Sequence, residues 1–427
     1  MAGPDIQQTI RAVFGIESPR LIAGLTRMVR DVGVAEELAQ DALVAALEQW
    51  PVSGVPNNPG AWLTAIAKNR ALNVLRRGKM LERKHAELGY VLEAQSLAVA
   101  DELDAALDDE LGDDLLKLMF TACHPVLSTE ARVALTLRLL GGLTTAEIAR
   151  AFLQPEPTVA QRIVRAKRTL ADKRVPFEVP RGPELGERLA SVLEVIYLIF
   201  NEGYSATAGE DCMRPALCED ALRLGRTLAE LAPNEPEVHG LVALMEINAS
   251  RTPARVDAAG EPILLLDQNR SRWDRLLIGR GLAALARAEG LAGSRGPYVL
   301  QAAITACHAR AAVAADTDWS RIAALYGELS ELMRSPVVEL NRAVAVSMAE
   351  GPAAGLAIVD ALGSQPALQN YHLLPSARAD FLFKLGRLRE AALEFERAAA
   401  LTQNVRMRDR LLARAAECVQ ASTRQHP

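Results

Sequence analysis

The chain has 427 residues with 48 basic and 53 acidic side chains, so its formal net charge is −5. Hydrophobic residues make up 50% of it, which is enough to bury cores and excludes a largely disordered chain. No apolar run approaches the roughly 20 residues that span a bilayer, and no basic stretch followed by an apolar one opens the chain. The five cysteines are scattered rather than arranged as a disulfide framework. These features indicate a cytoplasmic protein without a membrane segment.

Composition favours an all-α fold. Ala, Leu, Arg and Glu, which are strong helix formers, dominate the chain, whereas aromatic residues are only 4% of it. Few windows alternate apolar and polar residues in the way a half-buried strand does. Shifts in charge and clusters of proline predict three helical zones and two linkers, with boundaries at 1–90, 91–114, 115–175, 176–186 and 187–427.

The first zone contains two predicted amphipathic helices. The helix at 34–50 has an apolar stripe formed by Leu43, Leu47 and Trp50. A loop rich in Pro, Asn and Gly follows, and the next helix, at 59–77, has two stripes. Its buried stripe is predicted to consist of Leu63, Ala67, Ala71 and Val74. Its polar and basic stripe, Asn69, Asn73 and Arg76, is typical of a helix that faces nucleic acid, although a solvated face has the same pattern.

The segment 91–114 is acidic and contains no Lys or Arg. Dense like charge resists packing, so we interpret it as a solvated linker. A functional alternative is that it shields the flanking basic surfaces from non-specific DNA. The three closely spaced residues Pro176, Pro180 and Pro183 predict the second linker, because proline interrupts a continuing helix.

The second zone contains a candidate helix-turn-helix. Thr144 and Glu147 have the spacing of a capping box and predict a helix start. After a short turn, Pro157 fits the first position of the next helix. That helix has one apolar stripe, formed by Val159, Ile163, Ala166 and Leu170. Gln161, Arg162, Arg165 and Arg168 point elsewhere, as side chains that read a DNA major groove must.

Together, these two zones resemble bacterial sigma factors of the sigma-70 family, in the extracytoplasmic-function (ECF) subfamily. The stretch 34–41, Val-Ala-Glu-Glu-Leu-Ala-Gln-Asp, in a helix ending at Trp50, is similar to the beginning of the family's region 2. The pattern Ala-Trp-Leu-x-x-Ile-Ala-x-Asn at 61–69 is similar to its next helix. Pro155, Thr158, Val159 and Arg162 match region 4, whereas Pro157, Ala160 and Gln161 depart from its pattern.

The resemblance implies a subunit that brings core RNA polymerase to promoter DNA. Polar contacts to the coiled coil of the polymerase β′ clamp would come from Glu37, Gln40 and Asp41. The melted −10 element would be held by Asn57, Asn58, Lys68, Asn69, Arg76 and Arg77. The −35 element would be read by Thr158, Gln161, Arg162, Arg165 and Arg168. The resemblance implies no catalytic activity, cofactor or metal.

The third zone reads as a series of helices separated by Gly, Pro and Asn. Within 385–401, Gly386, Ala391, Phe395 and Ala398 stand at the spacing of tetratricopeptide (TPR) repeats, and 221–234 is similar. The whole chain thus resembles ECF factors with a TPR-like C-terminal extension. This implies that the extension controls the sigma module, directly or through a protein partner. A plain helical bundle is the alternative.

Three further motifs are interpreted as structural. Phe200–Tyr204 and Ala306–Ala309 look catalytic at first sight, but no second thiol or imidazole stands at metal-ligand spacing. Arg270–Asp274 reads as a helix start rather than a ligand cage. Two other functions stay open: a dimeric helix-turn-helix repressor or activator with a helical ligand- or partner-binding half, and a TPR scaffold that keeps a helix-turn-helix fold.

Overall fold

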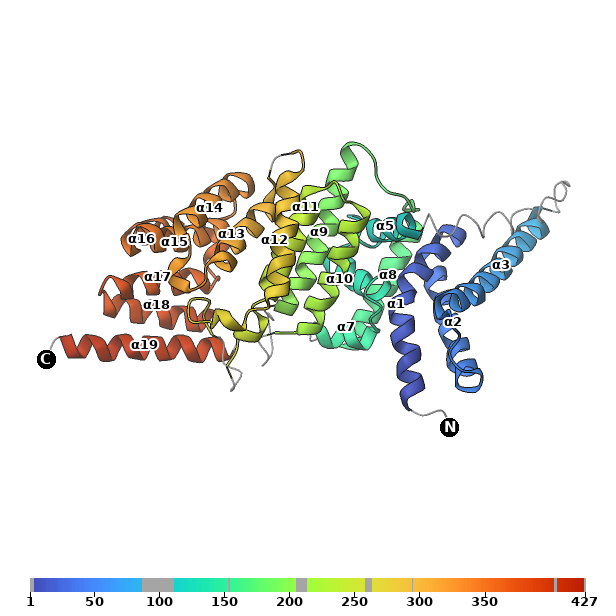
Figure 1. Ribbon diagram of the computed structural model, residues 1–427, viewed down its shortest axis with the longest axis horizontal. Helices are drawn as coiled ribbons and strands as arrows, with labels where there is room; N and C mark the ends of the chain where they lie inside the picture. The colour runs from blue at the N-terminus through green and yellow to red at the C-terminus, as the bar shows by residue number, and fades with distance from the viewer. Residues whose placement is uncertain are drawn as a thin grey trace. The chain divides into compact units, whose positions relative to one another are not determined.

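The computed structural model describes residues 4–86, 111–152, 154–204, 213–257, 263–293, 295–402 and 405–425 (Figure 1). This described part contains helices and no β-strand, which confirms the all-α prediction. No helix in it is both long and apolar enough for a bilayer span. The chain divides into two compact units, Met1–Leu198 and Ile199–Pro427, and the boundary falls inside helix α9 (Pro183–Tyr204).

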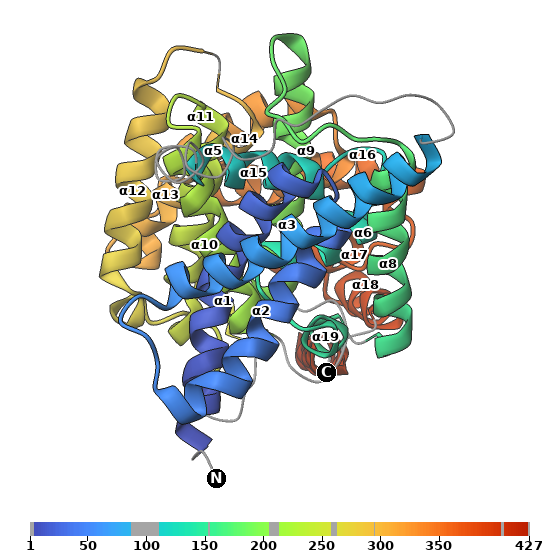
Figure 2. The same cartoon turned by 90° about the vertical axis from the view of Figure 1, so that its right-hand side faces the viewer.

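Three helices form the N-terminal part of the first unit and pack against one another (Figure 2): α1 (Pro4–Val29), α2 (Val32–Ser53) and α3 (Pro59–Ala86). Asp31 caps α2, because its carboxylate accepts the backbone N–H of Val34 at 2.9 Å. Trp50 is buried, and its ring meets that of Trp62 edge-on with 5.3 Å between the centroids. The two tryptophans therefore join the end of α2 to the start of α3.

The buried faces of α2 and α3 differ in part from the predicted stripes. Leu63, Ala67 and Ala71 are buried as predicted, but Val74 is 43% exposed and Leu47 is 37% exposed. In α2 the core face is instead lined by alanines at 35, 39, 42, 45 and 46, together with Leu38. Small side chains let neighbouring helices approach closely, so the larger leucine lies outside the contact.

Four helices follow: α5 (Leu111–Ala122), α6 (Thr129–Leu139), α7 (Thr145–Ala151) and α8 (Glu156–Asp172). The last two, α7 and α8, are the helices of the predicted helix-turn-helix. The capping box at Thr144 and Glu147 is present, with both reciprocal hydrogen bonds formed. Pro157 is the second residue of α8 rather than the first, because Pro155 is the N-cap. The predicted stripe of α8 is buried at all four positions: Val159, Ile163, Ala166 and Leu170.

Most of the predicted acidic linker, 91–110, lies outside the described residues. Its last four residues are helical, because α5 begins at Leu111. Asp114 is 1% exposed and pairs with Arg27 of α1 at 3.2 Å and with Lys117 at 3.2 Å. A carboxylate predicted to be solvated therefore ties α5 to α1.

The beginning of α9 belongs to the first unit. This helix starts at Pro183, which lies inside the predicted linker 176–186, because proline fits the first turn of a helix. Arg188 Nη2 donates to the carbonyl oxygen of Phe120 at 3.0 Å, and Ser191 Oγ donates to that of Cys123 at 2.6 Å. These bonds hold the first turns of α9 on α5.

The second unit continues from α9 as a series of helices in which chain neighbours pack on each other (Figure 1). They are α10 (Pro215–Leu231), α11 (Pro236–Ala249), α12 (Arg275–Gly290), α13 (Pro297–Arg310), α14 (Trp319–Met333), α15 (Pro336–Glu350), α16 (Pro352–Leu362), α17 (Leu373–Lys384), α18 (Leu388–Leu401) and α19 (Val405–Gln425). In α18, the residues predicted at repeat positions, Ala391, Phe395 and Ala398, are buried.

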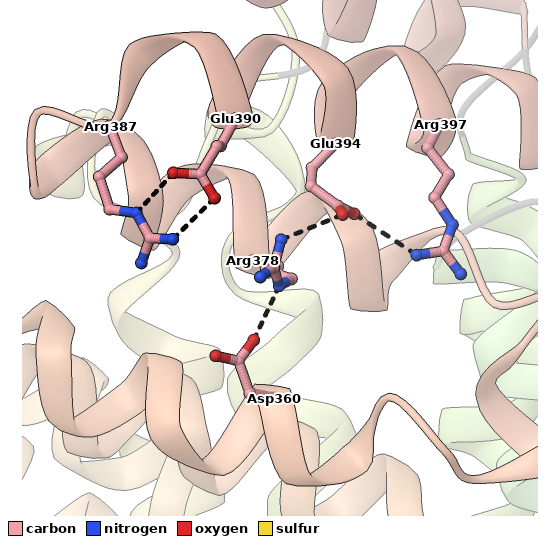
Figure 3. A network of polar contacts seen from close by, with 6 residues as sticks. All are labelled: Asp360, Arg378, Arg387, Glu390, Glu394 and Arg397. Atoms are coloured by element: carbon pink, nitrogen blue, oxygen red, sulfur yellow. Dashed lines mark hydrogen bonds and ion pairs between the residues drawn. The ribbon is translucent and has the colours of Figure 1, made fainter.

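An ion-pair network, called here the α16–α18 network, links three of these helices (Figure 3): Asp360, Arg378, Arg387, Glu390, Glu394 and Arg397. Arg378 of α17 lies between Asp360 of α16, at 2.8 Å, and Glu394 of α18, at 3.1 Å. Arg387 binds Glu390 with two hydrogen bonds, of 2.8 and 2.7 Å. Every arginine of this network thus has a carboxylate partner.

Candidate polymerase and DNA interface

The residues predicted to bind the polymerase clamp share one face of α2. Glu37 and Asp41 are exposed and Gln40 is half-buried. Residues three and four apart in a helix lie on the same side, so these three form one accessible polar patch. Asp41 also pairs with Arg70 of α3 at 3.0 Å, with both side chains largely in solvent. That contact links the polar face of α2 to α3 at the surface.

The loop before α3 presents Asn57 and Asn58, both exposed. The side-chain oxygen of Asn58 accepts the backbone N–H of Ala61 at 3.1 Å, and its carbonyl accepts that of Trp62 at 3.2 Å. Asn58 therefore caps α3. Asn57 makes no such bond in the described hydrogen bonds, so the two asparagines, equivalent in the sequence, differ in the structure: one positions the helix and the other extends from it.

Along α3, the predicted polar stripe is accessible. Asn69, Asn73 and Arg76 are exposed, and Lys68 is half-buried beside them. The side chain of Arg77 lies outside the described residues. Asn69, Asn73 and Arg76 recur at spacings of four and three, so they form a continuous face opposite the buried residues of the helix.

The outer face of α8 carries the residues predicted to read DNA. Thr158, Gln161, Arg165 and Arg168 are exposed on the side away from the buried stripe. Arg162 is half-buried, and its Nη1 donates to the side chain of Gln154 in the preceding turn at 2.8 Å. Arg162 is therefore partly engaged in holding the turn, whereas the other four side chains project from a helix whose opposite face is fixed.

A buried carboxylate that the sequence did not single out joins α2 to the helix-turn-helix. Glu36 is 4% exposed; its Oε1 accepts from Arg138 Nε of α6 at 2.5 Å, and its Oε2 pairs with Lys167 of α8. Its neighbour Glu37 is exposed. The adjacent glutamates are alike in the sequence, and the cations that distinguish them lie about a hundred or more residues away, so helical periodicity gives no signal for this contact.

The described cysteines are buried free thiols, and Cys212 lies outside the described residues. Burial raises the pKa of Cys123 to about 11 and that of Cys218 to about 12, so neither is a ready nucleophile or metal ligand. Within the described part of the chain, no three His, Cys, Asp or Glu side chains are grouped to hold a metal ion.

Comparison with known proteins identifies families that match three parts of this chain. Residues 15–80 match the family described as sigma-70 region 2, and residues 117–170 match sigma-70 region 4. Residues 188–289 match a family of unknown function, DUF6596. An uncharacterized protein of Rhizobium meliloti (strain 1021) is 43% identical over 388 residues, which cover 90% of each chain. No solved structure matches.

The matched regions coincide with the structural elements described above. Region 2 includes the polar faces of α2 and α3, and region 4 includes α6, α7 and α8. Both occur in the order that the sequence motifs predicted, and the helical array of the second unit follows them. The chain belongs to the sigma-70 family of sigma factors, which support transcription initiation.

Proposed function

We propose that this protein is an ECF-type sigma factor that directs core RNA polymerase to specific promoters in the cytoplasm. The observation that carries the proposal is the two-sided character of α8. Its four stripe residues are buried, so its backbone is fixed, and its outer face presents Thr158, Gln161, Arg165 and Arg168. A rigid helix with Arg and Gln on its free side suits major-groove readout, because these side chains can form paired hydrogen bonds with guanine and adenine.

The faces of α2 and α3 receive complementary roles in this proposal. The polar patch of Glu37, Gln40 and Asp41 would bind the β′ clamp. Asn57, Asn58, Lys68, Asn69, Arg76 and Arg77 would hold the melted −10 strand, which lacks a groove and is bound through its bases and phosphates. The net negative charge of the whole chain does not oppose DNA binding, because the cationic residues are grouped locally.

We further propose that the second unit is a TPR-like domain that regulates the sigma module or binds a protein partner. Its consecutive helices pack in chain order, as helical repeats do. Truncation after Leu198 tests this role, since a cut after α8 would also remove the turns of α9 that bond to α5. Unchanged promoter-specific transcription by the truncated chain would remove the regulatory role.

Run-off transcription with purified core polymerase and genomic DNA fragments tests the main proposal. We expect defined start sites with the full chain. Arg165→Ala should lower initiation about tenfold, the usual loss for one base-reading arginine. Asp41→Arg should abolish co-purification with core polymerase. Arg387→Ala, in the second unit, is the matched control and should change neither.

The same experiment separates the alternatives. A helix-turn-helix repressor or activator would bind a duplex operator with full affinity in the absence of polymerase and would support no initiation. A scaffold would bind no promoter at all. Either result would overturn the sigma-factor proposal for this chain.

A further inference from the structure

Three sequence motifs interpreted above as structural come together in the second unit. Tyr204 ends α9, Arg270 and Trp273 precede α12, and His308 lies in α13. Arg251 and Arg255, which flank a short 3-10 turn after α11, are in contact with these residues. Arg251, Arg255 and Arg270 are called here the arginine cluster.

Two aromatic rings connect the three guanidinium groups. The guanidinium carbon of Arg255 lies 3.6 Å from the ring centroid of Tyr204, and that of Arg251 lies 6.0 Å from the same ring. Arg251 is also 5.9 Å from the Trp273 ring, and Arg270 is 5.0 Å from it. The three guanidinium groups therefore form a row in which an aromatic ring separates each pair of neighbours. Tyr204 lies between Arg255 and Arg251, and Trp273 lies between Arg251 and Arg270.

The arginine cluster is not neutralised by ion pairs with carboxylates in the part of the chain that the structure describes. Among the described residues, no carboxylate forms an ion pair with any of its three arginines. Arg251 donates to the side chain of Asn248, and Arg270 donates to the carbonyl oxygens of His308 and Ala311 at 2.8 and 2.9 Å. These partners are neutral. The nearby carboxylate of Glu202 is already paired with Arg214, and that of Asp316 is exposed.

Several donors of the cluster have no acceptor. Arg251 and Arg270 are only 7% and 5% exposed, yet the Nε of each is buried without a hydrogen-bond partner. One terminal nitrogen of Arg255, Nη1, is unpartnered in the same way. Leaving a buried donor of a charged group without an acceptor is costly, so these donors are available to water or to the oxygen atoms of a ligand.

We propose that the arginine cluster binds the oxyanion group of a small molecule, a phosphate or a carboxylate. Guanidinium groups present paired N–H donors that match both kinds of oxyanion. Duplex DNA is too large to reach side chains as buried as those of Arg251 and Arg270. Tyr204 and Arg255 are half-buried and form the accessible edge of the site.

His308 provides an independent reporter of the site. Burial, together with the charges of Arg251 and Arg270, lowers the pKa of this histidine to about 4. A bound anion would offset those charges, so the pKa of His308 should rise when the site is filled.

Isothermal titration of the full chain with inorganic phosphate and, separately, with citrate tests the proposal and distinguishes the two sources of oxyanion. Ionic strength is matched with chloride in both arms. We expect saturable binding of at least one probe at millimolar concentration. Arg255→Met should weaken it about tenfold or more, as removal of a charge-assisted donor does. Arg378→Met, an arginine with its own carboxylates (Figure 3), is the matched control and should retain binding.

Arg251→Met removes a more buried charge and can impair folding, so Arg251→Lys, which keeps the charge but loses the forked donors, accompanies it. Weaker binding by a folded Arg251→Lys or Arg255→Met chain supports the site. Absence of saturable binding by the wild-type chain for both probes, or equal binding by wild type and Arg255→Met, would overturn it. None of these readouts depends on transcription.

Discussion

The second unit holds arginines in two contrasting settings. In the α16–α18 network each guanidinium contacts a carboxylate, and the arginine side chains reach solvent: that of Arg378 is 27% exposed and that of Arg387 is 45% exposed. In the arginine cluster, Arg251 and Arg270 are nearly inaccessible, and their neighbours are aromatic rings and neutral acceptors. Arginine is thus paired with a carboxylate where it reaches solvent, and it has no ion pair where it is buried.

This contrast separates structural charge from functional charge. A solvent-exposed ion pair contributes little stability, because water already solvates both partners. A buried cation without a partner costs stability, so its retention points to a ligand or to a specific requirement of the fold. The arginine cluster belongs to the second kind, and the α16–α18 network to the first.

A third setting, in the first unit, completes the comparison. Glu36 is as buried as Arg251 and Arg270, but it has two cationic partners, Arg138 and Lys167. Here a buried charge is compensated by ion pairs. Such a site loses the most when one partner is removed, since the remaining charges are left uncompensated.

The largest effect is therefore expected at Glu36. Glu36→Gln keeps the shape of the side chain and removes its charge, which leaves Arg138 and Lys167 facing a neutral amide. We expect a loss of about 3 kcal/mol in the local stability of α2 and α8. Hydrogen exchange of α2 and α8 peptides in the full chain should accelerate about a hundredfold. Glu37→Gln, at the exposed neighbouring position, is the control; equal exchange in the two variants would contradict the prediction.

A smaller, pH-dependent effect is expected at His308, whose ring packs edge-on against Trp319 at 5.2 Å. Burial, and to a smaller extent the charges of Arg251 and Arg270, hold its pKa at about 4 instead of 6.5. The unfolded chain takes up the proton first as the pH falls below 6.5, so stability is lost between pH 6.5 and 4.

The loss at His308 amounts to about 2 kcal/mol between neutral pH and about pH 5. Urea unfolding at the two pH values measures it in wild type and in His308→Gln, and the variant should show the weaker pH dependence. If phosphate is bound, the wild-type dependence should weaken as well. Identical pH dependence in wild type and variant would show that His308 is not held neutral in the folded chain.

Local features of this chain were predictable because local physics decides them. The α8 stripe and the capping box at Thr144 follow from helical periodicity and from hydrogen bonding over three residues, and both are present. The structural role of a proline is harder to predict from the sequence. Pro183 was interpreted as part of a linker but begins α9, because proline both interrupts a preceding helix and fits the first turn of a new one.

The contacts that the sequence did not predict are long-range. Glu36 meets cations from α6 and α8, and Asp114, expected to be solvated, meets Arg27 of α1. The arginine cluster likewise draws on the end of α9, the turn after α11 and the segment before α12. Leu47 was placed in the core by periodicity alone, but the choice between leucine and alanine there depends on how closely neighbouring helices approach.

The smallest effect is expected in the α16–α18 network. Arg378→Met removes the residue that bridges Asp360 and Glu394, but all three side chains reach solvent and can be rehydrated. We expect a loss below about 1 kcal/mol in urea unfolding, further reduced at high salt. The double variant Arg378→Met with Asp360→Asn should cost about the same as Arg378→Met alone. A loss as large as that at Glu36 would show that this network stabilises the packing of α16, α17 and α18 as strongly as a buried ion pair does. Solvent-accessible and buried ion pairs would then not differ in their contribution to the stability of this chain.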